Sequence, residues 1–143
     1  MNKTILYKVV SCNNAGITLQ SINKAAIFHI TWKELFLPEY ICATTNKQIF
    51  FLGTYYAHNL RNLNLHQLLN KDPEIKNINK IILAELKGDN YILMDLKTNK
   101  TETLSINFLL HNLGLLDDFT ATQSFFLGAR VGSIYDKSNL KTI

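Results

Sequence analysis

The sequence predicts an α+β protein made by internal duplication of one β-β-β-α-α unit, with pseudo-twofold symmetry and antiparallel sheets packed on helices. Two observations lead to this prediction. Residues 45–57 and 120–132 both read Thr-x-x-Gln-x-Phe-Phe-Leu-Gly-x-x-x-small, at an offset of 75 positions. Each copy also follows a run of strand-like segments and a short helix-like segment. Strands grouped before helices favour α+β over alternating βαβ winding, and the matched order favours duplication.

We expect a single domain over residues 1–143, with repeats at about 5–60 and 80–136 and a connector at 61–79. The chain is 47% hydrophobic and 18% charged, so it can bury enough apolar surface to fold. The two halves are expected to fold as one cooperative unit. Two arrangements remain open: the strands join into one sheet or barrel, or the long helices pack between two sheets.

The first copy begins with three strand-like segments rich in β-branched and aromatic residues. Asn13-Asn-Ala-Gly16 and Asn23-Lys24 separate them and favour turns. The expected strands cover residues 5–12, 17–22 and 25–30. Thr31 and Glu34 then have the spacing of a capping box, so a short helix is expected to start there and to stop before Pro38.

The longer helix of the first copy is expected to start at Thr45, with Gln48 as its capping-box partner, and to run to about Asn59. His58 and Arg61 place positive charge near its C-terminal end, where the helix dipole favours it. The connector then forms another amphipathic turn or two over 63–69, which Asp72-Pro73 ends.

The second copy repeats this order. Its strands are expected at 80–86, 91–96 and 101–106, with turns at 87–90 and 97–100. A short helix at 105–112 should end at Gly114, acting as a C-terminal cap. Thr120 and Gln123 form the last capping box, and the last long helix runs over 125–135, with Lys137 and Lys141 beyond its end.

Small residues recur four positions apart on both long helices: Gly53 with Ala57, and Gly128 with Gly132. A glycine inside a helix costs about 1 kcal/mol relative to alanine, so a packing reason is expected. We predict that the two long helices cross each other at these faces. The alternative is that one such face docks a helix of a partner.

The charge pattern and the absence of known motifs argue against several classes of function and identify none. The net charge is +4, and thirteen lysines are scattered without a basic run, beside only two arginines. This pattern is weak for nucleic acid, although Tyr7, Trp32 and Tyr91 could stack on bases beside lysines. The histidines and cysteines match no metal-binding or nucleophile motif. Asp117-Asp118 suits the N-terminus of a helix. We therefore predict no cofactor, no metal and no enzymatic activity.

The sequence also shows no signal peptide and no apolar run long enough to span a membrane, so we expect a cytoplasmic protein. The leading hypothesis is a non-enzymatic intracellular interaction protein: an adaptor, scaffold or small subunit of a larger assembly. The alternatives are a nucleic-acid-binding protein and a small-molecule sensor with its pocket between the repeats. Homo-oligomerisation stays open.

A specific surface is expected where the copies differ, at Thr54–Ala57 against Ala129–Gly132. Aromatic, arginine and leucine side chains are the residue types that commonly anchor interfaces or form exposed apolar patches. The candidate interaction residues are Trp32, Tyr55, Tyr56, Leu65, Leu68, Leu69 and Arg130.

Overall fold

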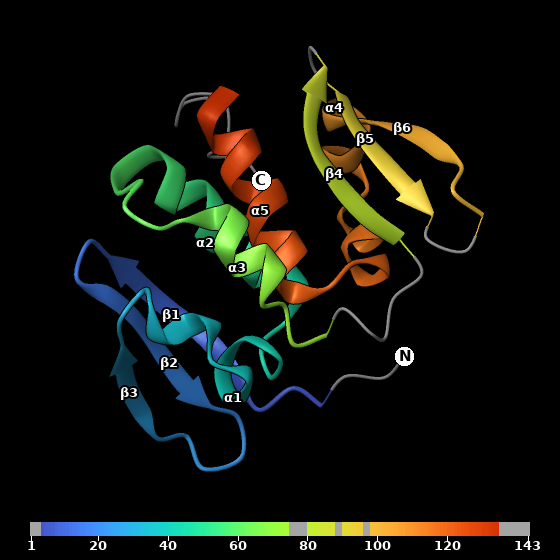
Figure 1. Cartoon of the computed structure of the whole chain (residues 1–143). Coiled ribbons are helices and arrows are strands. Elements are labelled where there is room, and N and C mark those ends of the chain that lie inside the picture. Colours follow the sequence, from blue (N-terminus) through green and yellow to red (C-terminus); the bar gives the residue numbers. More distant parts are fainter. Residues whose placement is uncertain (1–3, 75–79, 88–89, 96–97, 135–143) are drawn as a thin grey trace.

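The structure, a computed structural model, describes residues 4–74, 80–87, 90–95 and 98–134. It is a mixed α+β fold in which two separate three-stranded antiparallel sheets flank a central pair of long helices (Figure 1). In each sheet the strands are neighbours in sequence order. Of the two arrangements left open above, the one with the long helices between the sheets is therefore observed.

The first half forms one sheet, short helical segments and the first long helix. Asn13 Oδ1 accepts hydrogen bonds from the backbone N–H groups of Ala15 and Gly16 (2.8 and 3.1 Å), and this closes the first hairpin. The elements are β1 (Tyr7–Asn13), β2 (Gly16–Ser21), β3 (Ile27–Ile30), the 3₁₀ helix η1 (Glu34–Phe36), α1 (Pro38–Ile41) and α2 (Asn46–Asn59).

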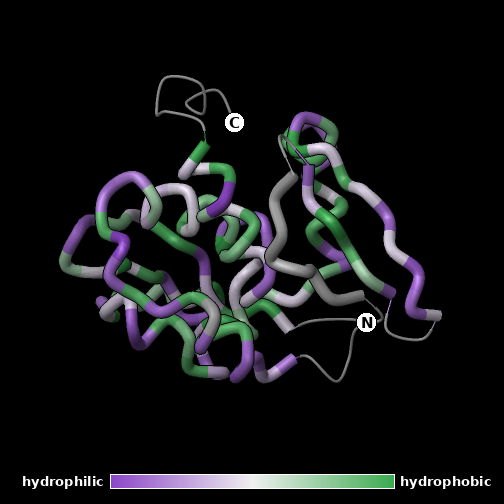
Figure 2. Tube along the Cα trace, turned by 45° about the horizontal axis from the view of Figure 1, so that its top comes forward, coloured by the Kyte–Doolittle hydropathy of each residue, from purple (hydrophilic) through white to green (hydrophobic). Residues whose placement is uncertain are grey.

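After a helical connector, the second half again has three strands, two short helical segments and a long helix, but its short α-helix precedes its 3₁₀ helix. Its elements are α3 (Leu65–Asn70), β4 (Lys80–Lys87), β5 (Asn90–Asp95), β6 (Thr101–Ser105), α4 (Ile106–His111), the 3₁₀ helix η3 (Leu113–Asp118) and α5 (Ala121–Ile134). Hydrophobic and hydrophilic residues follow one another closely along the trace (Figure 2). Such interleaving suits sheets that have one covered face and one open face.

The hydrogen bonds of the predicted capping boxes form, with one exception, although η1 itself begins at Glu34, three residues after Thr31. Thr31 and Glu34 bond reciprocally (2.9 and 3.1 Å), and so do Thr120 and Gln123 (3.2 and 3.1 Å). Thr45 Oγ1 accepts from the backbone N–H of Gln48 at 3.3 Å. The Gln48 side chain instead accepts a hydrogen bond from the Val9 backbone N–H (3.0 Å), beside the bulge in β1. That capping box is therefore only half formed.

One predicted helix end is confirmed and one is wrong. The short helix stops before Pro38 as expected, since η1 ends at Phe36. Pro38 then occupies the first turn of α1, a helix that was not predicted, where its missing N–H costs nothing. Gly114 was expected to cap α4; the cap is Asn112, and Gly114 lies inside η3. The turn residues 88–89 and 97, and the basic residues after α5, lie outside the described residues.

The two long helices cross at their small residues, as predicted. α2 and α5 share the most extensive contact between any two elements of the described chain. A Cβ atom on Gly53 would overlap the carbonyl oxygen of Phe125, and one on Gly128 would overlap that of Phe50. These faces therefore pack against each other inside the molecule and are not open to a partner helix.

Two apolar cores lie on either side of this helix pair, and each long helix contributes side chains to both cores. The first core contains Ile17, Leu19 and Ile30 from the first sheet, together with Phe125 from α5. The second core joins β5, α4 and η3 to α5, and it contains Phe50 from α2. Each half thus sends one phenylalanine of its shared motif into the core of the other half.

The end of the connector is fixed to the N-terminus of α5. Thr120 Oγ1 donates to Asp72 Oδ2 (2.5 Å), and the Ala121 backbone N–H donates to Glu74 Oε1 (3.0 Å). Both carboxylates complement the positive end of the helix dipole. Asp117 and Asp118 were predicted to complement this helix dipole, but their side chains are exposed in η3.

We expect Asp72→Ala to lower the free energy of unfolding by about 1–3 kcal/mol, because Asp72 is buried and Thr120 would lose its charged acceptor. Urea unfolding followed by the emission of Trp32 measures this. Asp117→Ala is the control, because it removes the same charge from an exposed site near the same helix. Equal losses in both variants would mean that general charge near α5, and not this bond, matters.

Among the described residues, no helix is long and apolar enough to cross a membrane.

Candidate ligand-binding pocket

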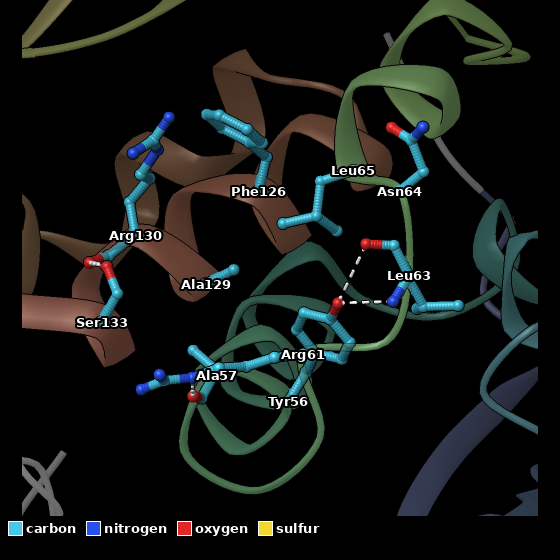
Figure 3. A pocket seen from close by; sticks show the side chains of 10 residues that line it. All are labelled: Tyr56, Ala57, Arg61, Leu63, Asn64, Leu65, Phe126, Ala129, Arg130 and Ser133. Carbon is cyan, nitrogen blue, oxygen red and sulfur yellow. Dashed lines mark hydrogen bonds between the residues drawn. The ribbon is translucent and has the colours of Figure 1, made fainter.

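A pocket of about 430 Å³ opens at one end of the crossing between α2 and α5. The two helices form one part of its wall, and the segment from Arg61 into α3 forms the other (Figure 3). Its volume lies within the usual range for small-molecule sites. The lining residues are Tyr56, Ala57, Arg61, Leu63, Asn64, Leu65, Phe126, Ala129, Arg130 and Ser133.

The apolar part of the pocket is held in shape by the Tyr56 side chain. Its hydroxyl accepts a hydrogen bond from the Leu63 backbone N–H (2.7 Å) and donates one to the Leu63 carbonyl oxygen (3.1 Å). Asn64 then caps α3 by accepting from the Gln67 backbone N–H (3.1 Å). The connector is thereby pinned against α2, and the Tyr56 hydroxyl is already occupied, so Tyr56 offers mainly ring surface to a ligand.

Arg61 reaches the pocket because the backbone turns sharply after α2. Its φ angle is 64°, in the left-handed region, which directs the side chain back over the last helical turn. There Arg61 Nε donates to the Ala57 carbonyl oxygen at 2.6 Å. This bond satisfies a carbonyl at the helix end and fixes the stem of the arginine beside the pocket.

Arg130 lies on α5, and its guanidinium carbon is 5.1 Å from the ring centroid of Phe126. A guanidinium over an aromatic face is favourable and stays charged throughout the ordinary pH range. In Figure 3, both guanidinium groups lie on the side of the pocket opposite Leu63 and Leu65. The pocket therefore has an apolar side and a cationic side.

The structure brings together three of the seven predicted interaction residues. Tyr56, Leu65 and Arg130 line this pocket, from α2, α3 and α5 respectively. Leu69 packs against the second core, and Leu68 is half-buried; neither lines the pocket. The leucines of the connector thus contribute to packing as well as to a binding surface.

The two remaining candidates, Trp32 and Tyr55, form a different cluster. Trp32 is only 5% exposed, and its Nε1–H donates to the Asn13 carbonyl oxygen at 2.8 Å. Its ring stacks on Tyr55 with 5.7 Å between centroids and 4° between planes. The Tyr55 hydroxyl donates to Asn14 Oδ1 (2.9 Å). This cluster holds the first hairpin onto α2.

The aromatic groups proposed to stack on nucleic-acid bases do not form such a platform. Trp32 and Tyr91 are buried, and the Tyr91 hydroxyl donates to the Leu127 carbonyl oxygen at 2.7 Å. Tyr7 packs in an aromatic group with Phe28 and Tyr40. The stacking role predicted for Trp32 and Tyr91 is therefore wrong, because a buried ring cannot receive a base.

The surroundings of two histidines and one cysteine bear on possible metal and nucleophile sites. No group of three or more histidine, cysteine or acidic side chains is placed to hold a metal ion in the part of the chain that the structure describes. His29 Nδ1 bonds with Thr18 Oγ1 (2.8 Å), and His111 Nδ1 bonds with the Asn107 carbonyl oxygen (2.8 Å). Burial raises the pKa of the Cys12 thiol, which disfavours the reactive thiolate.

The candidate interaction residues leave out much of the pocket lining, including Arg61, Asn64 and Phe126. One signal was present: the chain has two arginines among fifteen basic residues, and each stands just beyond or within a long helix. The pocket also lies at the tetrapeptides where the two copies differ, since Tyr56, Ala57, Ala129 and Arg130 all line it.

No family model, curated protein or solved structure matches this chain, so its function is argued from the geometry described above.

Proposed function

We propose that this protein is a non-enzymatic binding protein and that the pocket at the α2–α5 crossing holds a small organic ligand. The observation that carries the proposal is the pocket itself, which combines a size of about 430 Å³ with aromatic and aliphatic walls and two arginines. Sites of this kind use apolar walls for affinity and a few placed polar groups for orientation. A sensor that responds to a cytoplasmic ligand fits this description.

We further propose that the fold arose by duplication and has pseudo-twofold symmetry. The contacts between the motifs support this: Gly53 meets Phe125, and Gly128 meets Phe50. The 75-position offset converts one contact into the other, which is the reciprocity that a twofold relation produces. The pocket then lies where the copies have diverged, as expected if duplication supplied the scaffold and later change supplied the site.

A second candidate is the adaptor role, in which a protein partner binds the open face of the first sheet. Val10 and Ile27 are 50% and 60% exposed, whereas their neighbours Val9 and Phe28 pack toward the first core. Exposed β-branched side chains on one sheet face are a common feature of interaction surfaces. The pocket remains the stronger argument because residues from both halves build it.

An NMR fragment screen tests the proposed function. Fragments that are acidic, neutral and basic are added to the ¹⁵N-labelled protein, and we expect a subset to shift the backbone amide signals of Leu65, Phe126 and Ala129. Ser133→Trp should abolish these shifts, because Ser133 is exposed and lines the pocket, so a large side chain there fills it.

The matched control is Ile134→Trp, which adds the same ring at the next position, outside the pocket lining. Binding should persist in this variant. A screen in which no fragment of any charge shifts the pocket amides would refute the proposed function, and so would equal binding by the wild-type and Ser133→Trp proteins.

A further inference from the structure

Building on the proposed function, we infer that the ligand of this pocket is an organic carboxylate with an apolar body. The inference starts from where the arginines lie. Both arginines of the chain line this one pocket, although they come from different elements and stand far apart in sequence. No lysine is among the described residues that line it. The planar guanidinium group matches a carboxylate with two parallel hydrogen bonds, which the lysine ammonium group cannot do.

Arg61 is positioned to bind such a group. Within the described residues its side chain makes one hydrogen bond, in which Nε donates to the Ala57 carbonyl oxygen. The terminal nitrogens Nη1 and Nη2 are not used by that bond and can donate to a ligand. Because the stem is fixed against the helix end, less side-chain entropy is lost when the carboxylate binds.

Arg130 supplies a second fixed positive charge at the boundary between the apolar wall and solvent. Its guanidinium lies against Phe126, and the side chain is half-buried. Partial burial reduces screening by water and salt, so this charge attracts an anion more strongly than an exposed one. No acidic side chain is among the described lining residues, so none of these residues opposes an anion.

The rest of the pocket selects against a small, fully polar anion. Leu63, Leu65, Phe126 and Ala129 offer apolar surface, and the Tyr56 hydroxyl is occupied by the Leu63 backbone. A ligand that fills this space gains affinity by burying apolar atoms there. Inorganic phosphate or acetate would leave this surface wet, and a neutral hydrocarbon would not use the terminal nitrogens of Arg61.

A second pocket in the same molecule provides a contrast. It also measures about 430 Å³ and has apolar walls that include Leu93, Phe108 and Phe119. Its lining carries Glu102 and Asp118 and, among the described residues, no arginine or lysine. Size and apolarity are therefore shared, and the sign of the charge distinguishes the two sites. A carboxylate ligand should choose the first.

Isothermal titration calorimetry with 2-naphthylacetate and its neutral amide, 2-naphthylacetamide, tests the inference. The two compounds have almost the same shape and differ in charge. We expect the carboxylate to bind the wild-type protein about tenfold more tightly, the equivalent of one charge-assisted hydrogen bond. Arg61→Gln and Arg130→Gln should each reduce this preference several-fold and leave binding of the amide nearly unchanged. Lys47→Gln, an exposed position on α2, removes one charge away from the pocket and should change neither.

A measurement on the wild-type protein alone guards against variants that misfold. Raising the ionic strength from about 0.1 M to about 1 M shortens the Debye length from about 10 to about 3 Å, so the preference for the carboxylate should fall. Equal affinities for the two compounds at low salt would overturn the inference. A preference that survives both Arg→Gln substitutions would do the same. In either case, neutral fragments that shift the pocket amides would leave the proposed function standing.

Discussion

Gly128→Ala should lower the free energy of unfolding by at least about 3 kcal/mol. We expect few other substitutions that add a single methyl group to destabilise this protein as much. The new Cβ atom would overlap the carbonyl oxygen of Phe50 and crowd its carbonyl carbon and Cα atom. These are backbone atoms inside a helix, so they cannot rotate away as a side chain would. Relief requires α2 and α5 to separate, which opens both apolar cores. Thermal and urea unfolding followed by circular dichroism measure the loss.

Gly114→Ala is the matched control for this substitution. Gly114 has no heavy atom within 4 Å of a Cβ placed on it, and its φ angle is not in the left-handed region. The same added methyl group should therefore be neutral or stabilise the protein by up to about 1 kcal/mol, because alanine restricts the unfolded chain. Similar stability for both variants would show that the helices do not meet closely at Gly128.

Trp32→Ala should destabilise the protein by about 3–5 kcal/mol, the usual range for removing a large buried aromatic side chain. The substitution leaves a cavity next to Tyr55 and Phe125, and it removes the hydrogen bond donated to the Asn13 carbonyl oxygen. Because Trp32 links the first hairpin to α2 and α5, the loss affects the first core as a whole. Circular dichroism is the appropriate probe, since this variant has no tryptophan left.

Two companion variants separate the parts of this effect. Trp32→Phe keeps an aromatic ring but cannot donate to Asn13, and it should cost about 1–3 kcal/mol. Phe108→Ala removes an aromatic ring that is 55% exposed, and it should cost well under half as much as Trp32→Ala. If Trp32→Ala cost no more than Phe108→Ala, Trp32 would be a surface residue, as the interface interpretation of the sequence requires.

Local signals in the sequence predicted most of the elements. Asn13 and Gly16 mark the first hairpin turn, and Thr31 and Thr120 mark helix starts, because each acts through hydrogen bonds within three residues. The spacing of the glycines on the two long helices predicted where those helices cross. These features depend on neighbours along the chain or on one helical face, so they can be read without knowing the tertiary structure.

Two errors concern side chains for which the fold supplies a partner that competes with the local one. Gln48 has the correct spacing for its own helix end, yet it bonds to Val9 because β1 passes beside it. Trp32 stands in a turn where both burial and exposure are common, and its partner Tyr55 is far along the chain. Neither choice follows from local sequence, because the competing partner is brought near by the fold.

The pocket was the least predictable feature. Arg61 and Arg130 line one pocket because the connector turns back at a left-handed residue and runs beside the crossing of the two long helices. The hydrogen bond between Thr120 and Asp72 likewise joins residues that are 48 positions apart. The hypothesis of a pocket between the repeats anticipated the location in general terms. The residues that line the pocket could not be predicted without knowing the path of the connector, and the sequence has no periodic pattern that indicates this path.

The exchange of phenylalanines between the cores has a consequence for how the protein is made. Ribosomes release the first sheet and α2 before they synthesise α5, yet Ala121, Phe125 and Ala129 of α5 are part of the first core. The nascent first half therefore emerges with an uncovered apolar face, unlike a domain that can fold as soon as it leaves the tunnel. Native packing of the first core must wait until α5 has left the ribosome, and until then its uncovered apolar face is open to aggregation.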